Sequence, residues 1–203
     1  MTATISTERP LRADAARNRA KVLDGARKAF SVEGLDAEMA DVAKRAGVGV
    51  GTVYRHFPTK EALTTALAAD HFQRMADMTE EALEAGGDPW DAFEALIWRA
   101  AEYTAGDIGM CEVLAQTTTT QSVAVLADES ERLRAATFAL VERAKQTGVM
   151  REDATAWDVP TMMCGFGKIA VIEARGGPMS WRRYLELMLD GMRVRETGPR
   201  SDV

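Results

Sequence analysis

The segment from Val42 to Leu63 constrains the fold of this chain more than any other, and it reads VAKRAGVGVGTVYRHFPTKEAL. Its apolar residues recur at helical spacing on both sides of Gly47, a residue type that suits a tight turn. The pattern predicts two short helices that share one core, with the turn between them at Gly47. The segment therefore predicts a helix-turn-helix. Its core positions are Val42, Ala43, Ala46, Val48, Val53 and Phe57.

Side chains that donate hydrogen bonds lie between these apolar positions. They are Lys44, Arg45, Thr52, Tyr54, Arg55, His56 and Lys60. Residues of these types are the usual partners of a nucleic-acid backbone. We therefore interpret the segment as a DNA-contacting surface.

Three glycines in this segment, Gly47, Gly49 and Gly51, resemble the fingerprint of a dinucleotide-binding loop. That loop follows a buried strand, whereas a helix with charged residues precedes this one, so we reject a Rossmann fold. Glycine destabilises a helix, so two glycines in a first turn need a reason. We expect that the missing side chains let backbone N–H groups approach a phosphate, and a merely flexible turn is the alternative.

The net charge of −6 is unevenly divided along the chain. Residues 1–60 contain 11 Lys and Arg against 7 Asp and Glu, a balance of +4, and residues 61–203 contain 14 against 24, a balance of −10. This asymmetry predicts a basic unit that approaches phosphates and an acidic body that phosphates repel. Charges that merely solvate exposed faces account for most of the acidic side.

Composition excludes several classes of protein. Cys111 and Cys164 lie outside any CxxC or Cys/His cluster, so we expect neither a disulfide framework nor a zinc site. Residues 1–19 contain no apolar run typical of a signal peptide, and no apolar stretch is long enough to span a membrane. We therefore expect a cytoplasmic protein whose 46% hydrophobic content supplies a sizeable core.

The rest of the chain has helical periodicity and no strand pattern, which predicts an all-α fold of about nine helices. The expected helices cover residues 15–33, 39–46, 48–56, 59–85, 88–105, 110–115, 123–147, 155–175 and 180–192. Thr59 and the Asp88-Pro89 pair are expected caps, and the later helices are expected to bury Phe138 and Trp157. We expect a flexible basic arm over residues 1–14, a helix-turn-helix domain over 15–60, and a ligand-binding and dimerisation domain over 61–203.

The stretch AGVGVGTVYRHFPTKEAL resembles the signature of the TetR family of transcriptional regulators, in which a helix-turn-helix precedes an aromatic-His-Phe element and a Lys. The resemblance covers about residues 15 to 67. It implies a ligand-responsive regulator, in most cases a repressor, that binds a palindromic operator as a homodimer. It also implies a small-molecule effector and no cofactor.

The same resemblance assigns roles to residues of the motif. The aromatic, His and Lys positions of the family touch phosphates, which implies such contacts for Tyr54, His56 and Lys60. Val50 and Arg55 occupy positions that face the groove; many relatives have Lys where this chain has Val50, so base readout rests largely on Arg55, backbone groups and DNA shape. The full predicted DNA-binding set is Lys44, Arg45, Gly49, Val50, Gly51, Thr52, Tyr54, Arg55, His56 and Lys60.

The chain departs from the family just before the helix expected at residues 39–46. Relatives commonly have Thr or Ser there, which caps the helix and binds a phosphate, whereas this chain has Ala37 and Glu38. We expect Asp36 to cap the helix instead. A carboxylate at Glu38 favours the positive end of the helix but opposes a phosphate.

The body offers candidates for effector binding and for dimerisation. Met75, Met78, Trp98, Tyr103, Met110, Phe138, Met162, Met163 and Phe166 are predicted to line an adaptable pocket, although such residues are equally typical of a plain core. The helices expected at residues 155–175 and 180–192 are predicted to form the dimer interface, because their apolar faces are larger than one helix pair needs and the family pairs these helices about a two-fold axis. The interface residues named on the last helix are Trp181, Tyr184, Leu185, Met188, Leu189 and Met192.

Three alternatives to a ligand-released repressor stay open. A ligand-activated regulator has the opposite sign of response, and a protein-interaction scaffold uses the same fold without DNA. An enzyme is the third, with His71 as its candidate. A lone helical histidine is more often a surface or core residue, and no second His in the body completes a triad or a metal site. We therefore expect no catalytic residue, no metal and no cofactor.

Overall fold

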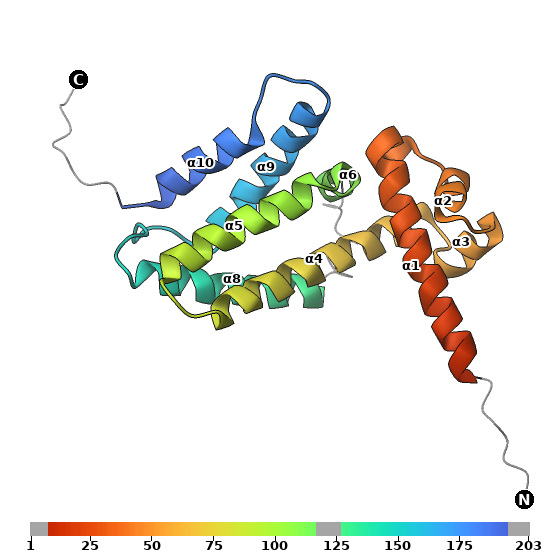
Figure 1. The fold of residues 1–203 in the computed structure, drawn as a ribbon, viewed down its shortest axis with the longest axis horizontal. Helices are drawn as coiled ribbons and strands as arrows, with labels where there is room; N and C mark the ends of the chain where they lie inside the picture. Colours follow the sequence, from red (N-terminus) through yellow and green to blue (C-terminus); the bar gives the residue numbers. More distant parts are fainter. Residues whose placement is uncertain (1–7, 117–126, 195–203) are drawn as a thin grey trace, which may run out of the picture.

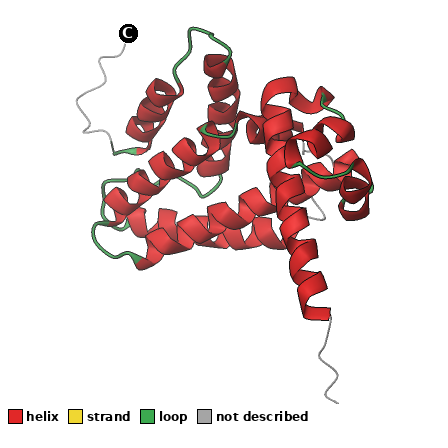
Figure 2. Ribbon diagram, turned by 45° about the vertical axis from the view of Figure 1, so that its right-hand side comes forward, coloured by secondary structure: helices red, strands yellow, loops and turns green. Residues whose placement is uncertain are grey.

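The computed structural model of this chain describes residues 8–116 and 127–194. Within these two ranges the fold consists of nine α-helices and one short 3-10 helix without any strand, so the prediction of an all-α protein is confirmed (Figure 2). Met150 and Arg193 form a single isolated β-bridge. Among the helices of the described ranges, none has the length and apolar character that a bilayer crossing requires.

The head of the molecule contains α1 (Glu8–Glu33), the 3-10 helix η1 (Gly34–Asp36), α2 (Met39–Ala46) and α3 (Val50–His56). These elements form a small unit at one end of the molecule, and α4 leads from this unit into a larger group of helices (Figure 1). We call the two parts the head and the body. The head has a core of its own, formed by side chains from α1 to α4 together with two side chains from α6.

The turn between α2 and α3 follows the predicted pattern. Gly47 has a φ of 66°, in the left-handed region that favours glycine, and its N–H donates to the carbonyls of Ala43 and Lys44. The prediction that Asp36 caps α2 is wrong, because Asp36 belongs to η1 and Glu38 occupies the N-cap. The backbone N–H of Glu38 donates to the Asp41 carboxylate at 3.0 Å, as in a capping box.

Helix α4 (Lys60–Glu84) belongs to both parts of the molecule, as its length predicts. It begins at the expected cap, where Thr59 Oγ1 accepts the Ala62 N–H at 3.0 Å. Near this start Leu63 is buried in the head core, and farther along Met75 is buried in the body core. One helix therefore contributes side chains to both cores.

The body contains α5 (Pro89–Ala105), α6 (Ile108–Gln116), α8 (Ala127–Lys145), α9 (Asp158–Ala174) and α10 (Trp181–Met192). In Figure 1 these helices and the second half of α4 form one group at the left, and α6 lies closest to the head. The body core takes its largest side chains from α4, α5, α9 and α10. They are Met78, Trp90, Phe93, Met162, Phe166 and Trp181.

Several expected boundaries move. Helix α1 begins at Glu8 rather than residue 15, so residues 8–14 of the expected flexible arm are helical and residues 1–7 lie outside the described ranges. Helix α3 begins at Val50 rather than residue 48, because Gly49 forms its N-cap. The expected loop after residue 116 and the start of the next helix also fall outside the described residues.

Two aromatic side chains that were expected to be buried are on the surface. Phe138 on α8 and Trp157, the N-cap residue of α9, are both exposed. The largest buried side chains of α8 are Leu140 and Val141. The helix therefore turns a different part of its circumference toward the core than its aromatic residue suggests.

The dimer prediction for α10 is corrected by its packing. Trp181, Leu185, Leu189 and Met192 are buried in the core of their own chain. A side chain buried within one subunit has no surface left for a second, so the prediction is wrong for these four residues. Only Tyr184 and Met188 of the predicted stripe are half-exposed.

Candidate nucleic-acid interface

Helix α3 has two faces with different chemistry. Val53 and Phe57 point into the head core and are almost completely buried. On the other side of the helix Val50 and Arg55 are exposed, and Tyr54 is 50% exposed. The inward residues fix the rotation of the helix, so the outward residues are presented to whatever approaches the head.

The glycines at the start of α3 are not required by contacts within the protein. A Cβ at Gly49 or Gly51 would meet no atom within 4 Å, and neither residue has a positive φ. The backbone here is therefore open to an external partner. This geometry is consistent with the expected approach of backbone N–H groups to a phosphate.

The predicted cations of the head are held in different ways. Arg55 and Lys44 are exposed, and within the described part of the chain no ion pair involves either of them. Arg45 instead forms an ion pair with Glu33 at 2.5 Å. The ammonium of Lys60 donates to the Leu35 carbonyl, so this predicted phosphate-binding residue already has one partner in the head.

The remaining predicted residues also lie on or near α3. Thr52 and His56 are half-exposed on this helix. The structure adds Arg19 of α1, whose guanidinium lies 5.4 Å from the ring centroid of Phe57. No local pattern connects Arg19 to Phe57, because their contact arises only when α1 packs on the helix-turn-helix.

Two family profiles match this chain. One is described as "Bacterial regulatory proteins, tetR family" and matches residues 22–67, which include the whole helix-turn-helix. The other is described as "Transcriptional regulator SbtR-like, C-terminal domain" and matches residues 88–194, more than half of the chain. The chain belongs to the TetR family. It is therefore a transcriptional regulator of a DNA-binding family and not a member of an enzyme family.

One relative of known structure supports this membership along most of the chain, and a second resembles the chain in fold. A TetR regulator from Mycobacterium vanbaalenii is 33% identical with a TM-score of 0.63, and the alignment covers 91% of this chain and 100% of that one. FadR of Bacillus subtilis in complex with stearoyl-CoA has a TM-score of 0.67, with 85% of this chain and 98% of that chain covered. At 16% identity, that likeness concerns the fold alone.

The transcriptional repressor KstR of Mycolicibacterium smegmatis is a relative of known function. It is 36% identical over 95 residues, which are 46% of this chain and 47% of KstR. This chain thus spans about half the length of the curated relatives that it matches.

The residues predicted to bind an effector do not all lie in one part of this TetR regulator. Met75, Met78, Met162 and Phe166 lie in the body core, and Trp98 and Met163 pack against it. The other three were predicted wrongly as members of that group. Met110 lies in the head core, Phe138 is on the surface, and Tyr103 stacks on His71 near the head.

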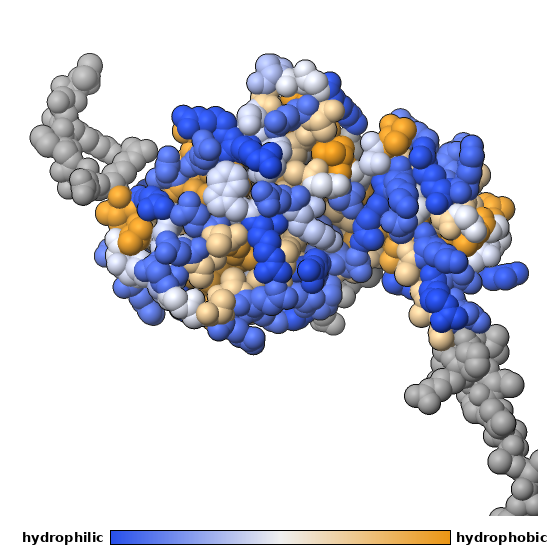
Figure 3. Space-filling view, in the orientation of Figure 1, coloured by the Kyte–Doolittle hydropathy of each residue, from blue (hydrophilic) through white to orange (hydrophobic). Residues whose placement is uncertain are grey.

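A surface hollow lies beside this core. It has a volume of about 390 Å³ and is bounded by the connection before α9, by α9 itself and by α10. Met162, Met188 and Met192 give it apolar walls, and Arg151 and Asp158 lie at its edge. In the view of Figure 3, hydrophobic residues appear as separate patches within a mainly hydrophilic surface.

The one buried histidine of the described residues is neutral near pH 7. His71 on α4 is 5% exposed and stacks on the Tyr103 ring at a centroid distance of 5.7 Å. Burial, helped by the positive charge of Arg27, lowers the pKa of His71 to about 4. Burial also raises the pKa of Tyr103. Within the described residues, no group of three or more potential ligands is suited to hold a metal ion.

Proposed function

We propose that this TetR regulator is a ligand-released repressor that binds a palindromic operator as a homodimer. The observation that carries the proposal is the division of α3 into a buried face and an outward face with Tyr54 and Arg55. A helix held in this way by its own core can enter a major groove and present donors to bases and phosphates. Chromosomal DNA as a partner implies action in the cytoplasm.

Repression rather than activation is supported by the relative KstR, which is named as a repressor. A small-molecule effector is supported by the family and by FadR, which was crystallised with stearoyl-CoA. The effector of this chain is proposed to bind among α4, α5, α8 and α9, where six of the predicted residues meet.

The dimer is proposed to form through the outer faces of α9 and α10. In the family the last two helices pair about a two-fold axis, and in this chain their outward side retains apolar residues. Leu187 is 53% exposed, and Met179 beside α10 is also exposed. These residues replace the buried stripe of α10 in the proposed interface.

Operator binding is tested directly by an electrophoretic shift with the DNA upstream of the protein's own gene. The proposal predicts a complex of two subunits on a palindromic segment, with a scrambled segment of equal length as the control. Equal affinity for both segments at physiological salt would contradict operator recognition, because non-specific binding depends only on phosphate charge.

A further inference from the structure

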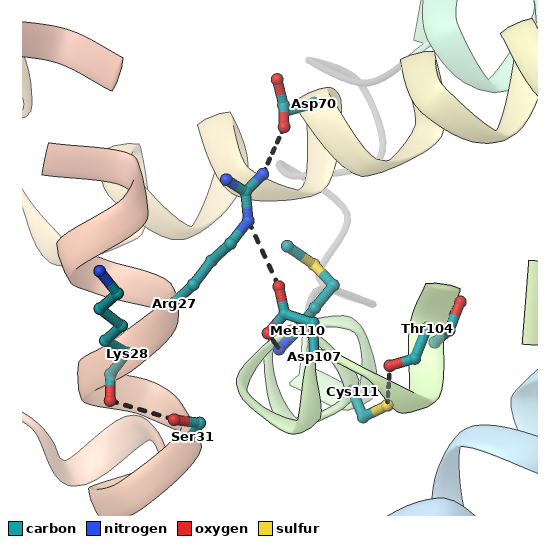
Figure 4. Close-up of polar contacts among 8 residues, drawn as sticks. All are labelled: Arg27, Lys28, Ser31, Asp70, Thr104, Asp107, Met110 and Cys111. Carbon is teal, nitrogen blue, oxygen red and sulfur yellow. Dashed lines mark hydrogen bonds and ion pairs between the residues drawn. The ribbon is translucent and has the colours of Figure 1, made fainter. Parts of the chain in front are cut away.

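Three elements of the molecule meet at the guanidinium of Arg27 (Figure 4). Arg27 lies on α1 of the head, and its side chain is 26% exposed. Its Nη2 pairs with Asp70 of α4, and its Nε lies 3.3 Å from the carboxylate of Asp107, which precedes α6. One side chain of the head thus binds two body elements at once.

Asp107 is itself fixed to the first turn of α6. Its Oδ1 accepts the Met110 N–H at 2.9 Å, which satisfies one of the free donors at the start of that helix. Its other oxygen faces Arg27. A shift of α6 therefore moves the carboxylate that Arg27 holds.

The backbones of α1 and α6 are in direct contact beside this ion pair. A Cβ at Gly109 would lie 2.6 Å from the Arg27 carbonyl oxygen and 2.7 Å from the Ser31 nitrogen. Met110 of α6 is buried in the head core. Because the two helices are packed this tightly, they have little freedom to slide while the Arg27 contacts persist.

On the α4 side of the contact, Asp70 lies next to a buried histidine. Asp70 is followed by His71, which is buried against Tyr103 of α5. His71 is uncharged near pH 7, so it does not repel the neighbouring guanidinium. Arg27 consequently meets two carboxylates, of which that of Asp107 is also held by the Met110 N–H.

We propose that Arg27 is a positioning residue that holds the head at a fixed angle to the body by binding α4 and α6 simultaneously. The packing of α1 against α6 limits sliding of the head, and the second ion pair, to Asp70 of α4, limits pivoting of the head about that packed contact. Partly exposed ion pairs contribute little to global stability. The main consequence of the Arg27 contacts is therefore the orientation of α3, and this part of the inference rests on the proposed function.

The orientation is measured without DNA by electron–electron distance spectroscopy between two spin labels. Exposed Ala20 on α1 and exposed Ala139 on α8 are changed to Cys, Cys164 is changed to Ser, and the labelled protein is diluted with unlabelled protein. Buried Cys111 stays unlabelled. Arg27→Gln should broaden the distance distribution, and Arg27→Lys should fall between it and the wild type, because a point charge cannot fork to two carboxylates.

The matched control is Lys28→Gln. Lys28 pairs with Asp24 at 2.7 Å within α1. The substitution therefore removes an ion pair from the same helix without changing a contact with the body. Its distribution should equal that of the wild type. Asp107→Asn retains an oxygen that can cap α6, and as a single substitution it should broaden the distribution. In the Arg27→Gln background it should add little, since both substitutions break the same Arg27–Asp107 ion pair.

Operator affinity is measured in parallel. Arg27→Gln should weaken it about tenfold, because fewer molecules hold the head at the binding angle. Unchanged distance distributions for Arg27→Gln, or equal broadening for Lys28→Gln, would overturn the positioning role. Failure of the wild-type protein to bind operator would contradict the proposed function, while the distance measurement still decides the role of Arg27.

Discussion

Arg55 and Lys60 have the same charge, but the fold holds them differently. Arg55 is exposed on α3, and within the described residues it has no ion pair to break before it meets DNA. Lys60 donates one of its three N–H groups to the Leu35 carbonyl, which leaves two donors for a phosphate. The internal bond holds the Lys60 ammonium beside η1, whereas in the proposed complex the exposed Arg55 reads a base edge.

Substitution of each residue should therefore have a different effect on DNA binding. Lys60→Ala should weaken binding to all sequences alike and lower the salt slope by about 1 for each subunit. Arg55→Ala should cost about 1 to 3 kcal/mol and relax the preference at one position of each half-site. Fluorescence anisotropy on operator and scrambled duplexes checks both. If Arg55→Ala discriminates between these duplexes as well as the wild type, Arg55 does not read a base.

Gly51 offers a second test, because its effects on stability and on binding should be opposite. Its position has open space for a Cβ, and alanine is the better helix former, so Gly51→Ala should stabilise the protein by about 0.5 to 1 kcal/mol. The added methyl group should nevertheless weaken operator binding by keeping the backbone away from the DNA. Urea unfolding and anisotropy measure the two effects. Unchanged operator affinity would show that glycine is not needed there for DNA contact.

His71 predicts a loss of stability in acid. Its pKa is lowered to about 4 in the folded protein from 6.5, so between these values the unfolded chain binds a proton that the folded chain does not. Stability therefore falls as the pH drops through this window, by up to about 3 kcal/mol at its lower end. Urea unfolding of the wild type and of His71→Phe at several pH values isolates the contribution of His71 to the pH dependence of the free energy of unfolding. A constant difference between the two proteins from pH 7 to 4 would contradict the prediction.

At the scale of elements, α10 shows how one helix can divide its apolar residues between two tasks. Its stripe from Trp181 to Met192 closes the core of its own subunit. Leu187, on another side of the helix, is left exposed. Because one face is already used, only the outward face is free for a partner subunit.

Aspartate substitutions on these two faces should have different outcomes. Leu187→Asp should leave the fold intact and produce monomers, because the charge lies on the outer face of each subunit. Leu185 is 0% exposed, so Leu185→Asp should instead destabilise the subunit by several kcal/mol through a buried, unpaired charge. Light scattering and thermal unfolding separate the effects. A Leu187→Asp protein with the mass of the wild-type dimer would exclude this face from the interface.

For the whole molecule, effector control of the proposed homodimer requires that the body changes the positions of two heads on one duplex. Two recognition helices fit successive major grooves only about 34 to 36 Å apart. The described contacts give the body two routes to the head, one through α4 and one through α6. An effector that shifts either helix can therefore disturb the spacing.

The coupling free energy between effector binding and operator binding can be measured from the affinity of either the effector or the operator. A coupling of 1 to 3 kcal/mol would weaken operator affinity roughly 5- to 150-fold, and operator would weaken effector affinity by the same factor. Calorimetric titration of an effector found by screening, with and without operator, should show this reciprocity. Identical effector affinities in the two titrations would exclude regulation of DNA binding by that compound, and tighter effector binding with operator would indicate activation.

Local sequence patterns predict the helices, the turn and most of the outward residues of the helix-turn-helix. Gly47, Thr59 and Asp88 each act on backbone groups a few residues away, so their effects can be derived from the local pattern. The outward position of Arg55 follows from its spacing from Val53 in the same short helix and from Phe57 at the C-cap of that helix. Such features depend on 3.6-residue periodicity and caps, which need no knowledge of distant residues.

Only the tertiary structure decided which faces meet. The stripe on α10 predicted that a face is buried but not that its own subunit covers it, and Phe138 is exposed because α8 packs through Leu140 and Val141. Arg27 meets Asp70 and Asp107 only after α1, α4 and α6 have packed together. Hydrophobic burial has no direction of its own, so the partner of an apolar face is selected by the shapes and volumes of elements that are distant in the chain.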